Sequence, residues 1–404
     1  MMSYFQFCTL PYNIYRFQSK VFLKLKNCET WRGKHPCQEG FSKEDKEALN
    51  VMSFVILVPI FKKELGIECD MVGFPLMFTK RLFTKYCLWD SKPENKAFFK
   101  QEIPDFDKKV NEYAFKKCAK GTDSIFTAWL FDAENQVDKQ TKECFEVAKA
   151  IATLVEFEEV EKDIRADVAS ETKERVYQNI NKYASKYPFI SDIVYSKGEY
   201  AKVLKLLHNL SWARYTFRWQ NYCCSVRCSI LTHMLESAVL GNFMFIEEHL
   251  EELKNSNPET NPELYHNLEK SFLVMLFHDI AEIWTDDIPS PAKDALGIRE
   301  VAEKQELVAL EKHFYSKLPK CAEEYFRNGI MLEDEANKNA KKFYKSADYF
   351  SADLEVAWNI RESARDERFG WILNDSYKNS YRTPIARKTL KFYIKQFRHI
   401  KFFE

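Results

Sequence analysis

A scarcity of turn-forming residues is the feature that most constrains how this chain can fold. Its 404 residues include only 10 glycines and 13 prolines. A β-sheet needs tight turns at regular intervals, and glycine and proline supply much of their chemistry. The sequence therefore predicts an all-α protein. A chain of this length also exceeds one compact core, which predicts two domains.

Composition and charge limit the classes of partner. Hydrophobic residues make up 46% of the chain and charged residues 30%, as in a globular protein. Lysine plus arginine and aspartate plus glutamate number 60 each, so no extended nucleic-acid partner is predicted. The apolar run from Val51 to Phe61 ends at Lys62 and falls short of the ~20 residues of a membrane span. It predicts a buried helix, and no membrane association is expected.

The cysteines predict a reducing environment. Eleven of them are scattered along the chain, and the N-terminal residues do not resemble a signal peptide. We therefore expect free thiols and a cytoplasmic location. The group Cys223, Cys224 and Cys228 lacks the paired spacing of a zinc site and predicts buried thiols.

Periodicity and chain breakers divide the sequence into predicted helices. They cover residues 43–63 with Ser42 as N-cap, 71–88, 138–185, 200–208, 229–252, 263–284, 297–316 and 338–365. We expect one or two surface helices over 138–185 and a long amphipathic helix over 229–252. Pro188 interrupts the pattern, which places a domain boundary near residue 190. For the basic and aromatic tail 388–403, an amphipathic closing helix is favoured over a phosphate-binding segment.

A histidine and an aspartate stand side by side in one of the most apolar stretches, at His278-Asp279. Alone, the pair indicates a capped core histidine beside a helix-terminal aspartate. His233 on the preceding predicted helix and Asp348 on a later one change this interpretation. Two histidines and two aspartates form a nitrogen and oxygen shell that suits a divalent transition ion with positions left for water and phosphate. Glu282 lies one helical turn beyond His278, on the same predicted face.

The order of these motifs resembles the HD superfamily of metal-dependent phosphohydrolases, and most closely the bacterial 5′-deoxynucleotidase group. That group has an Arg-Trp pair fifteen residues before the first ligand histidine, a His-Asp-x-x-Glu run followed by a proline-rich turn, and a Lys-x-Ala-Asp block. The corresponding blocks here are Arg218-Trp219 before His233, residues 278–282, residues 286–293, and residues 345–348. The resemblance covers roughly residues 195–365.

The resemblance implies a role for each matched residue. His233, His278, Asp279 and Asp348 would bind one divalent ion (cobalt, manganese, magnesium, zinc or iron). Glu282 and Asp287 would position or activate the attacking water. Arg218 and Lys293 would bind the phosphate and offset its charge, and Trp219 would pack near the sugar. The chain departs from the family at Ile230-Leu231-Thr232, at Asp286 in place of a glycine, and in the cysteine-rich segment before His233.

These residues predict a catalytic HD-domain helical bundle over residues 191–404. Residues 1–190 would form a helical domain without the metal, either an unrelated accessory domain or a degenerate HD repeat suggested by a faint echo at Trp31-Arg32. The expected reaction converts (deoxy)nucleoside 5′-monophosphates to nucleoside and phosphate. The alternatives are a deoxynucleoside triphosphohydrolase, a cyclic-nucleotide phosphodiesterase, a two-metal oxygenase, or a regulatory nucleotide-binding module. A homodimer is left open.

Overall fold

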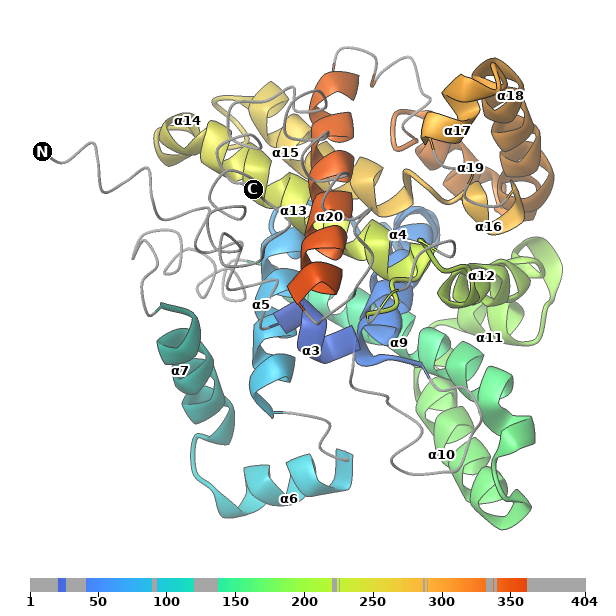
Figure 1. The fold of residues 1–404 in the computed structure, drawn as a ribbon. Helices are drawn as coiled ribbons and strands as arrows, with labels where there is room; N and C mark the ends of the chain where they lie inside the picture. Colours follow the sequence, from blue (N-terminus) through green and yellow to red (C-terminus); the bar gives the residue numbers. More distant parts are fainter. Residues whose placement is uncertain are drawn as a thin grey trace, which may run out of the picture.

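A computed structural model of the protein describes residues 21–26, 41–88, 93–119, 137–219, 224, 226–285, 288, 290–331, 337 and 340–361. Helices dominate these residues, and the described part of the chain contains no β-strand beyond one isolated bridge between Phe217 and Ser229 (Figure 1). The predicted all-α class is confirmed. Among the described helices, none is long and apolar enough to cross a membrane.

Helix α4 (Lys43–Leu65) is the central helix of the first half. Ser42 Oγ accepts a hydrogen bond from the Asp45 amide at 3.0 Å, and Asp45 Oδ2 accepts one from the Ser42 amide at 3.1 Å. This capping box satisfies two amides that the helix leaves open. Gly66 ends the helix in the left-handed conformation. The apolar run Val51–Phe61 is buried along its whole length, as the sequence predicts.

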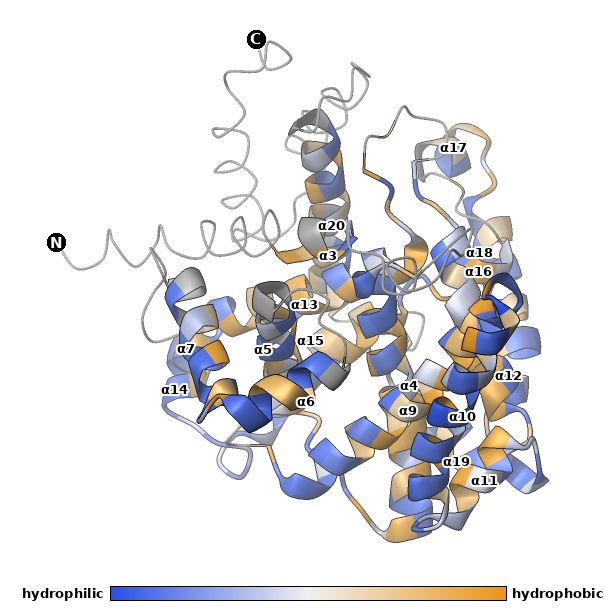
Figure 2. Cartoon of the chain, turned by 90° about the horizontal axis from the view of Figure 1, so that it is seen from below, coloured by the Kyte–Doolittle hydropathy of each residue, from blue (hydrophilic) through white to orange (hydrophobic). Residues whose placement is uncertain are grey.

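Helix α9 (Lys139–Val160) packs along α4 and contributes side chains such as Phe145 and Ile151 to the core. The prediction of a surface helix is therefore wrong for α9. It fits α10 (Ala166–Ala184) better, because that helix buries one narrow stripe and is largely hydrophilic outside it (Figure 2). A short 3-10 turn, η2 (Glu161–Asp163), separates the two helices.

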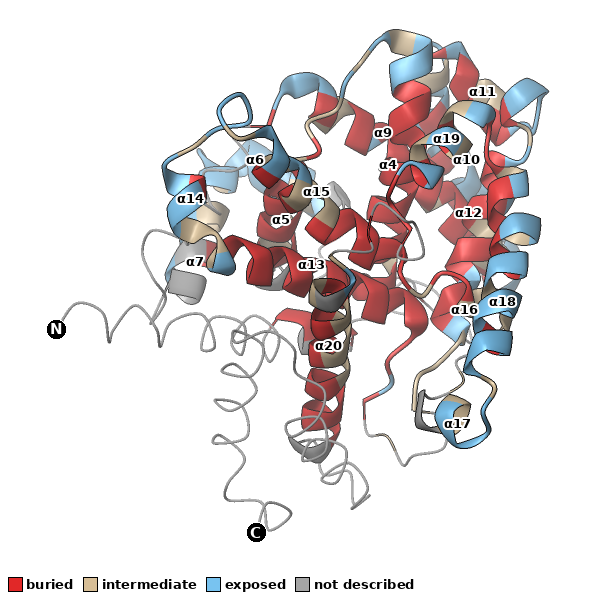
Figure 3. Ribbon diagram, turned by 90° about the horizontal axis from the view of Figure 1, so that it is seen from above, coloured by how far each residue is buried: buried red, intermediate tan, exposed pale blue. Residues whose placement is uncertain are grey.

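Helix α13 (Ile230–Glu248) lies at the centre of the second half. It packs against α4, α15 (Pro262–Phe277) and α20 (Lys341–Arg361). Every residue from Ile230 to Ile246 is buried, so the helix is not amphipathic as predicted but enclosed on all sides (Figure 3). Gly241 permits this, because a Cβ there would approach the Ser271 carbonyl oxygen to 2.9 Å.

The remaining helices surround these central ones. They are α3 (Leu23–Lys26), α5 (Phe74–Leu88), α6 (Pro93–Glu102), α7 (Phe106–Ala119), α11 (Pro188–Val194), α12 (Val203–Ser211), α14 (Leu250–Lys254), α16 (Glu282–Thr285), α17 (Ser290–Ala295), α18 (Arg299–Ala309) and α19 (Lys320–Arg327). Shorter elements are the 3-10 turns η3 (Gly198–Tyr200), η4 (Trp212–Tyr215) and η6 (Tyr315–Lys317) and the π-helical turn η5 (Leu310–Phe314). The polar stretch after α5 thus contains two helices.

One hydrophobic core crosses the predicted domain boundary. Helix α11 begins with Pro188 at its first turn, where the sequence pattern breaks. Yet α4 packs directly against α12, α13 and α19 of the second half, and the buried apolar residues of both halves form one cluster. The division into residues 1–190 and 191–404 stays a prediction.

Candidate metal centre

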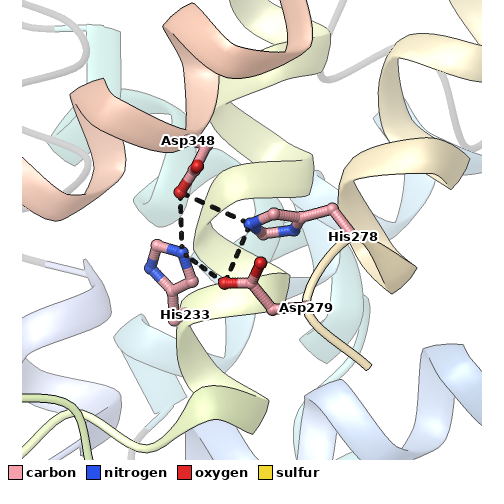
Figure 4. A group of neighbouring side chains, drawn as sticks. All are labelled: His233, His278, Asp279 and Asp348. Carbon is pink, nitrogen blue, oxygen red and sulfur yellow. Dashed lines mark hydrogen bonds and ion pairs between the residues drawn. The ribbon is translucent and has the colours of Figure 1, made fainter. Parts of the chain in front are cut away.

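Four side chains converge from three helical segments (Figure 4). His233 comes from the start of α13, His278 and Asp279 from the turn directly after α15, and Asp348 from α20. One nitrogen or oxygen atom of each lies within 4.8 Å of the others. His233 Nε2 is 3.3 Å from Asp348 Oδ1, and His278 Nε2 is 3.2 Å from Asp279 Oδ2. The structure therefore brings together all four residues that the sequence proposes as ligands.

The helix that carries His278 ends sooner than the sequence predicts. Helix α15 stops at Phe277, and the Glu282 amide donates to the Asp279 carbonyl at 3.0 Å in a tight turn. His278 Nδ1 lies 2.8 Å from the Met275 carbonyl oxygen. This side-chain contact competes with the backbone donor that would continue the helix. Glu282 consequently starts a new helix, α16, instead of lying on the face of His278.

The hydrogen-bond partners of the two rings leave lone pairs directed at the carboxylates. His233 Nδ1 lies 2.6 Å from Glu355 Oε1, and His278 Nδ1 faces the Met275 carbonyl. An acceptor opposite each Nδ1 favours a proton on that nitrogen, and in the neutral ring Nε2 then presents a lone pair. His278 Nε2 is buried without a hydrogen-bond partner. Two lone pairs facing two carboxylates repel one another unless a cation lies between them, so this donor set fits a divalent ion.

The electrostatics of the cluster favour positive charge. Burial alone would lower the pKa of His278, but Asp279 and Asp348 outweigh it and raise that pKa to about 10. Burial would raise the pKa of Asp279, but His278 holds it well below its usual range. The pKa of Asp348 is lowered as well, against burial, by His233 and His278. Protons on the rings or a metal ion can supply the charge that the carboxylates require.

A family comparison identifies the segment that builds this cluster. The family described as 5′-deoxynucleotidase YfbR-like matches residues 204–397. Residues 204–397, hereafter the YfbR-like segment, match the model of this family, which is a member of the HD-domain superfamily. No curated protein and no solved structure matches the chain. The match reaches further towards the C-terminus than the motifs predict, and all four cluster residues lie inside it.

Within the YfbR-like segment, Glu355 forms the outer shell of the cluster. It lies seven residues, or about two helical turns, after Asp348 on α20, and therefore on the same face. Its Oε1 faces His233 Nδ1, and its Oε2 accepts from Trp219 Nε1 at 2.7 Å and lies 3.4 Å from Arg218 Nε. Glu355 was not among the residues predicted from sequence, although its spacing from Asp348 is a signal that could have identified it.

The Arg218-Trp219 pair reaches the cluster because the chain before α13 folds back on itself. The Arg218 amide donates to the Cys228 carbonyl at 2.9 Å, beside the bridge between Phe217 and Ser229. Arg218 Nη1 then donates to Asp279 Oδ2 at 3.1 Å. The chain between Arg218 and His233 thus comes back to Arg218 just before α13 begins.

A second cluster of buried polar side chains includes Glu355. Atoms of Cys228, Glu236 and Glu355 converge closely enough to hold an ion. However, Lys26 Nζ from α3 lies 2.7 Å from Glu236 Oε1 and 3.1 Å from Cys228 Sγ. Its ammonium supplies a positive charge at this position, and we assign no metal there. No pattern in the sequence around Lys26 indicates this contact, because its partners lie about 200 residues away.

The other predicted site residues have varied positions. Lys293 in the YfbR-like segment pairs with Glu306 Oε1 at 2.8 Å, and Glu282 is half-buried at the start of α16. Asp287 lies outside the described residues. The roles proposed for Lys293, Glu282 and Asp287 stay predictions. Cys228 is buried as expected, and Cys224 is half-buried. Cys223, the tail 388–403, and Trp31-Arg32, which suggested a degenerate repeat, also lie outside the described residues.

Proposed function

We propose that this protein hydrolyses nucleoside 5′-monophosphates to nucleoside and phosphate, with deoxyribose preferred over ribose. One divalent ion would be held by His233, His278, Asp279 and Asp348. The observation that carries the proposal is the convergence of two ring lone pairs and two carboxylates inside a YfbR-like segment. When bound, the ion would polarise a phosphoryl oxygen and lower the pKa of a bound water.

The protein side chains would position the reactants around that ion. Glu282, three residues after Asp279, would accept a proton from the attacking water. Arg218 has five N–H donors, and its contacts to Asp279 and Glu355 fix the guanidinium at the edge of the cluster. In the proposed complex the guanidinium would bind the phosphate oxygens in a bidentate manner. Asp287 and Lys293 are proposed to assist the water and the phosphate.

Trp219 provides a physical reason for a preference between sugars. Its only polar atom, Nε1, already donates to Glu355, so the indole cannot offer that donor to a 2′-hydroxyl. A ribose hydroxyl against the ring would lose water without gaining a partner, which costs about 1–3 kcal/mol. We therefore expect a roughly ten- to hundredfold preference for deoxyribonucleotides.

A substrate screen tests the proposal. The full-length protein, supplemented in turn with each candidate metal, is assayed on paired ribo- and deoxyribonucleoside monophosphates, on triphosphates and on cyclic nucleotides. We expect inorganic phosphate from the deoxyribonucleoside monophosphates and none from a His278→Ala variant, whose metal content should also fall. Release of triphosphate, opening of a cyclic ester, or metal binding without turnover would support the alternative functions instead.

A further inference from the structure

A second hollow lies at the opposite end of α15 from the metal centre. It is a cleft of about 1060 Å³ between the C-terminal end of α4, the connection 66–73, and helices α14, α15 and α19. Glu269 in this cleft and His278 at the metal centre are nine residues apart on α15, or about 13 Å along the helix axis. Clefts of several hundred Å³ or more are typical of sites that bind small molecules.

Hydrogen bonds between backbone amides and side chains hold the wall formed by residues 66–73 in place. The Asp70 amide donates to Thr141 Oγ1 at 2.8 Å, and Asp70 Oδ1 accepts from the Gly73 amide at 2.8 Å and from the Val72 amide at 3.2 Å. A Cβ at Gly73 would lie 2.4 Å from Asp70 Oδ2, so this turn closes tightly around the carboxylate. The cleft is therefore preformed, and a ligand does not have to order this wall.

The floor of the cleft is apolar, and the lysines at its mouth are paired with acidic side chains. Buried side chains of Met71, Leu76, Leu253 and Leu268 form the floor. The exposed lysines at the mouth already have acidic partners, since Lys62 Nζ lies 2.7 Å from Glu68 and Lys254 Nζ lies 2.8 Å from Glu251. An anionic ligand would find no lysine of the cleft without a carboxylate beside it.

One corner of the cleft is polar and is lined by Tyr325 and Glu269. The Tyr325 hydroxyl oxygen is buried without a hydrogen-bond partner. Burial and, to a smaller extent, Asp70 raise the pKa of Glu269 to about 7, partly offset by Lys270. Burial and Glu269 also raise the pKa of Tyr325. A buried acceptor and a desolvated carboxyl both gain free energy from a charged donor.

We propose that this cleft binds a small amphipathic organic cation. Its ammonium head would lie between Glu269 and Tyr325, and its apolar body would extend along Leu253 and Leu268. The site is separate from the proposed nucleotidase centre and does not depend on it. A charged donor at Glu269 should be worth roughly ten- to a hundredfold in affinity over a neutral one.

A matched pair of probes tests the charge requirement. 4-Phenylbutylamine and 4-phenylbutan-1-ol share one apolar body and differ only in the head group. Titration calorimetry on the full-length protein at pH 7 should show the amine binding at least tenfold more tightly. Because Glu269 must then ionise, binding should release roughly half a proton, measured as a dependence of the heat on the buffer. Equal affinity for both probes, or no binding of the amine, would overturn the proposal.

Substitutions locate the site. Glu269→Gln should remove the preference for the amine and the proton release, and Tyr325→Phe should weaken amine binding several-fold. Glu263→Gln, an exposed carboxylate in the first turn of the same helix, is the control and should change neither. His278→Ala should lose the metal and keep amine binding, which separates this proposal from the proposed function. Undiminished amine binding by Glu269→Gln would place the amine elsewhere and refute the assignment.

Discussion

At the residue scale, the turn after α15 decides where the side chains of the metal centre lie. His278 and Asp279 are adjacent in sequence, yet they meet at one point only because α15 ends at Phe277 and the chain tightens into a turn. The same turn puts Glu282 at the start of α16. Its proposed role is therefore on the water and not on the ion, which makes the two functions experimentally separable.

We expect Glu282→Gln to lower the turnover number by roughly a hundred- to ten-thousandfold, the usual contribution of a positioned general base. The amide keeps the size of the side chain but cannot accept the proton. Metal content, measured by elemental analysis, should match that of the unmodified protein. A near-normal rate would remove Glu282 from the mechanism, and a loss of metal would make it a ligand.

Glu355→Gln should weaken metal binding by roughly ten- to a hundredfold without abolishing it. The carboxylate accepts from His233 Nδ1 at 2.6 Å and so fixes the tautomer that presents Nε2 to the ion. Competitive titration with a chelator measures the effect. Glu306→Gln, which alters a carboxylate paired with Lys293 outside the cluster, is the matched control. Unchanged affinity in Glu355→Gln would show that the contact between Glu355 and His233 does not contribute to metal binding.

At the element scale, charged contacts join helices that the hydrophobic core alone would not orient. His208 on α12 lies between two glutamates of α9, with Nε2 2.7 Å from Glu158 and Nδ1 2.9 Å from Glu159. Arg214 of η4 faces Glu159 at 3.8 Å. Burial lowers the pKa of His208, but the two glutamates outweigh it and raise the pKa to about 9. The contact therefore needs a protonated ring.

This contact should make the free energy of unfolding depend on pH. Because the pKa of His208 is raised, its stabilisation is complete below about pH 6.5 and is lost as the pH rises through about 9. The side chain is only 22% exposed, and the effect should reach at most about 3 kcal/mol. Urea unfolding at pH 6 and pH 10 should show this loss in the unmodified protein and not in His208→Gln. His266→Gln, at an exposed histidine with a lowered pKa, should behave like the unmodified protein.

At the scale of the whole molecule, the first half supports the site that the second half carries. Helix α4 packs against α12, α13 and α19 of the second half. Lys26 of α3 places an ammonium against Glu236, one turn beyond His233 on α13. Both side chains are nearly inaccessible to water. A buried ion pair of this kind holds the two halves in one arrangement, because either charge alone would be expensive to bury.

Lys26→Met should lower the free energy of unfolding by about 3–5 kcal/mol, since it leaves the Glu236 carboxylate buried without its cation. The double variant Lys26→Met/Glu236→Gln removes both charges and should recover much of that loss. Lys173→Met, at an exposed pair with Glu161, should cost less than about 1 kcal/mol. Chemical unfolding of the three variants decides the matter, and a single variant as stable as the control would contradict the assignment.

The sequence by itself determined the helical class, the start of α4 and the four residues of the cluster. These features depend on local chemistry: few turn formers, a capping serine followed by an acid, and motifs of fixed spacing. The tertiary structure alone decided that α9 and α13 are enclosed, that α15 stops before His278, and that Lys26, Glu355 and the cleft beside Glu269 exist as they do. The end of α15 follows a contact between the His278 ring and the Met275 carbonyl, which depends on where the ring points. The other features depend on which segments pack together, and contacts between residues 100 or 200 positions apart leave no periodicity that a single sequence can show.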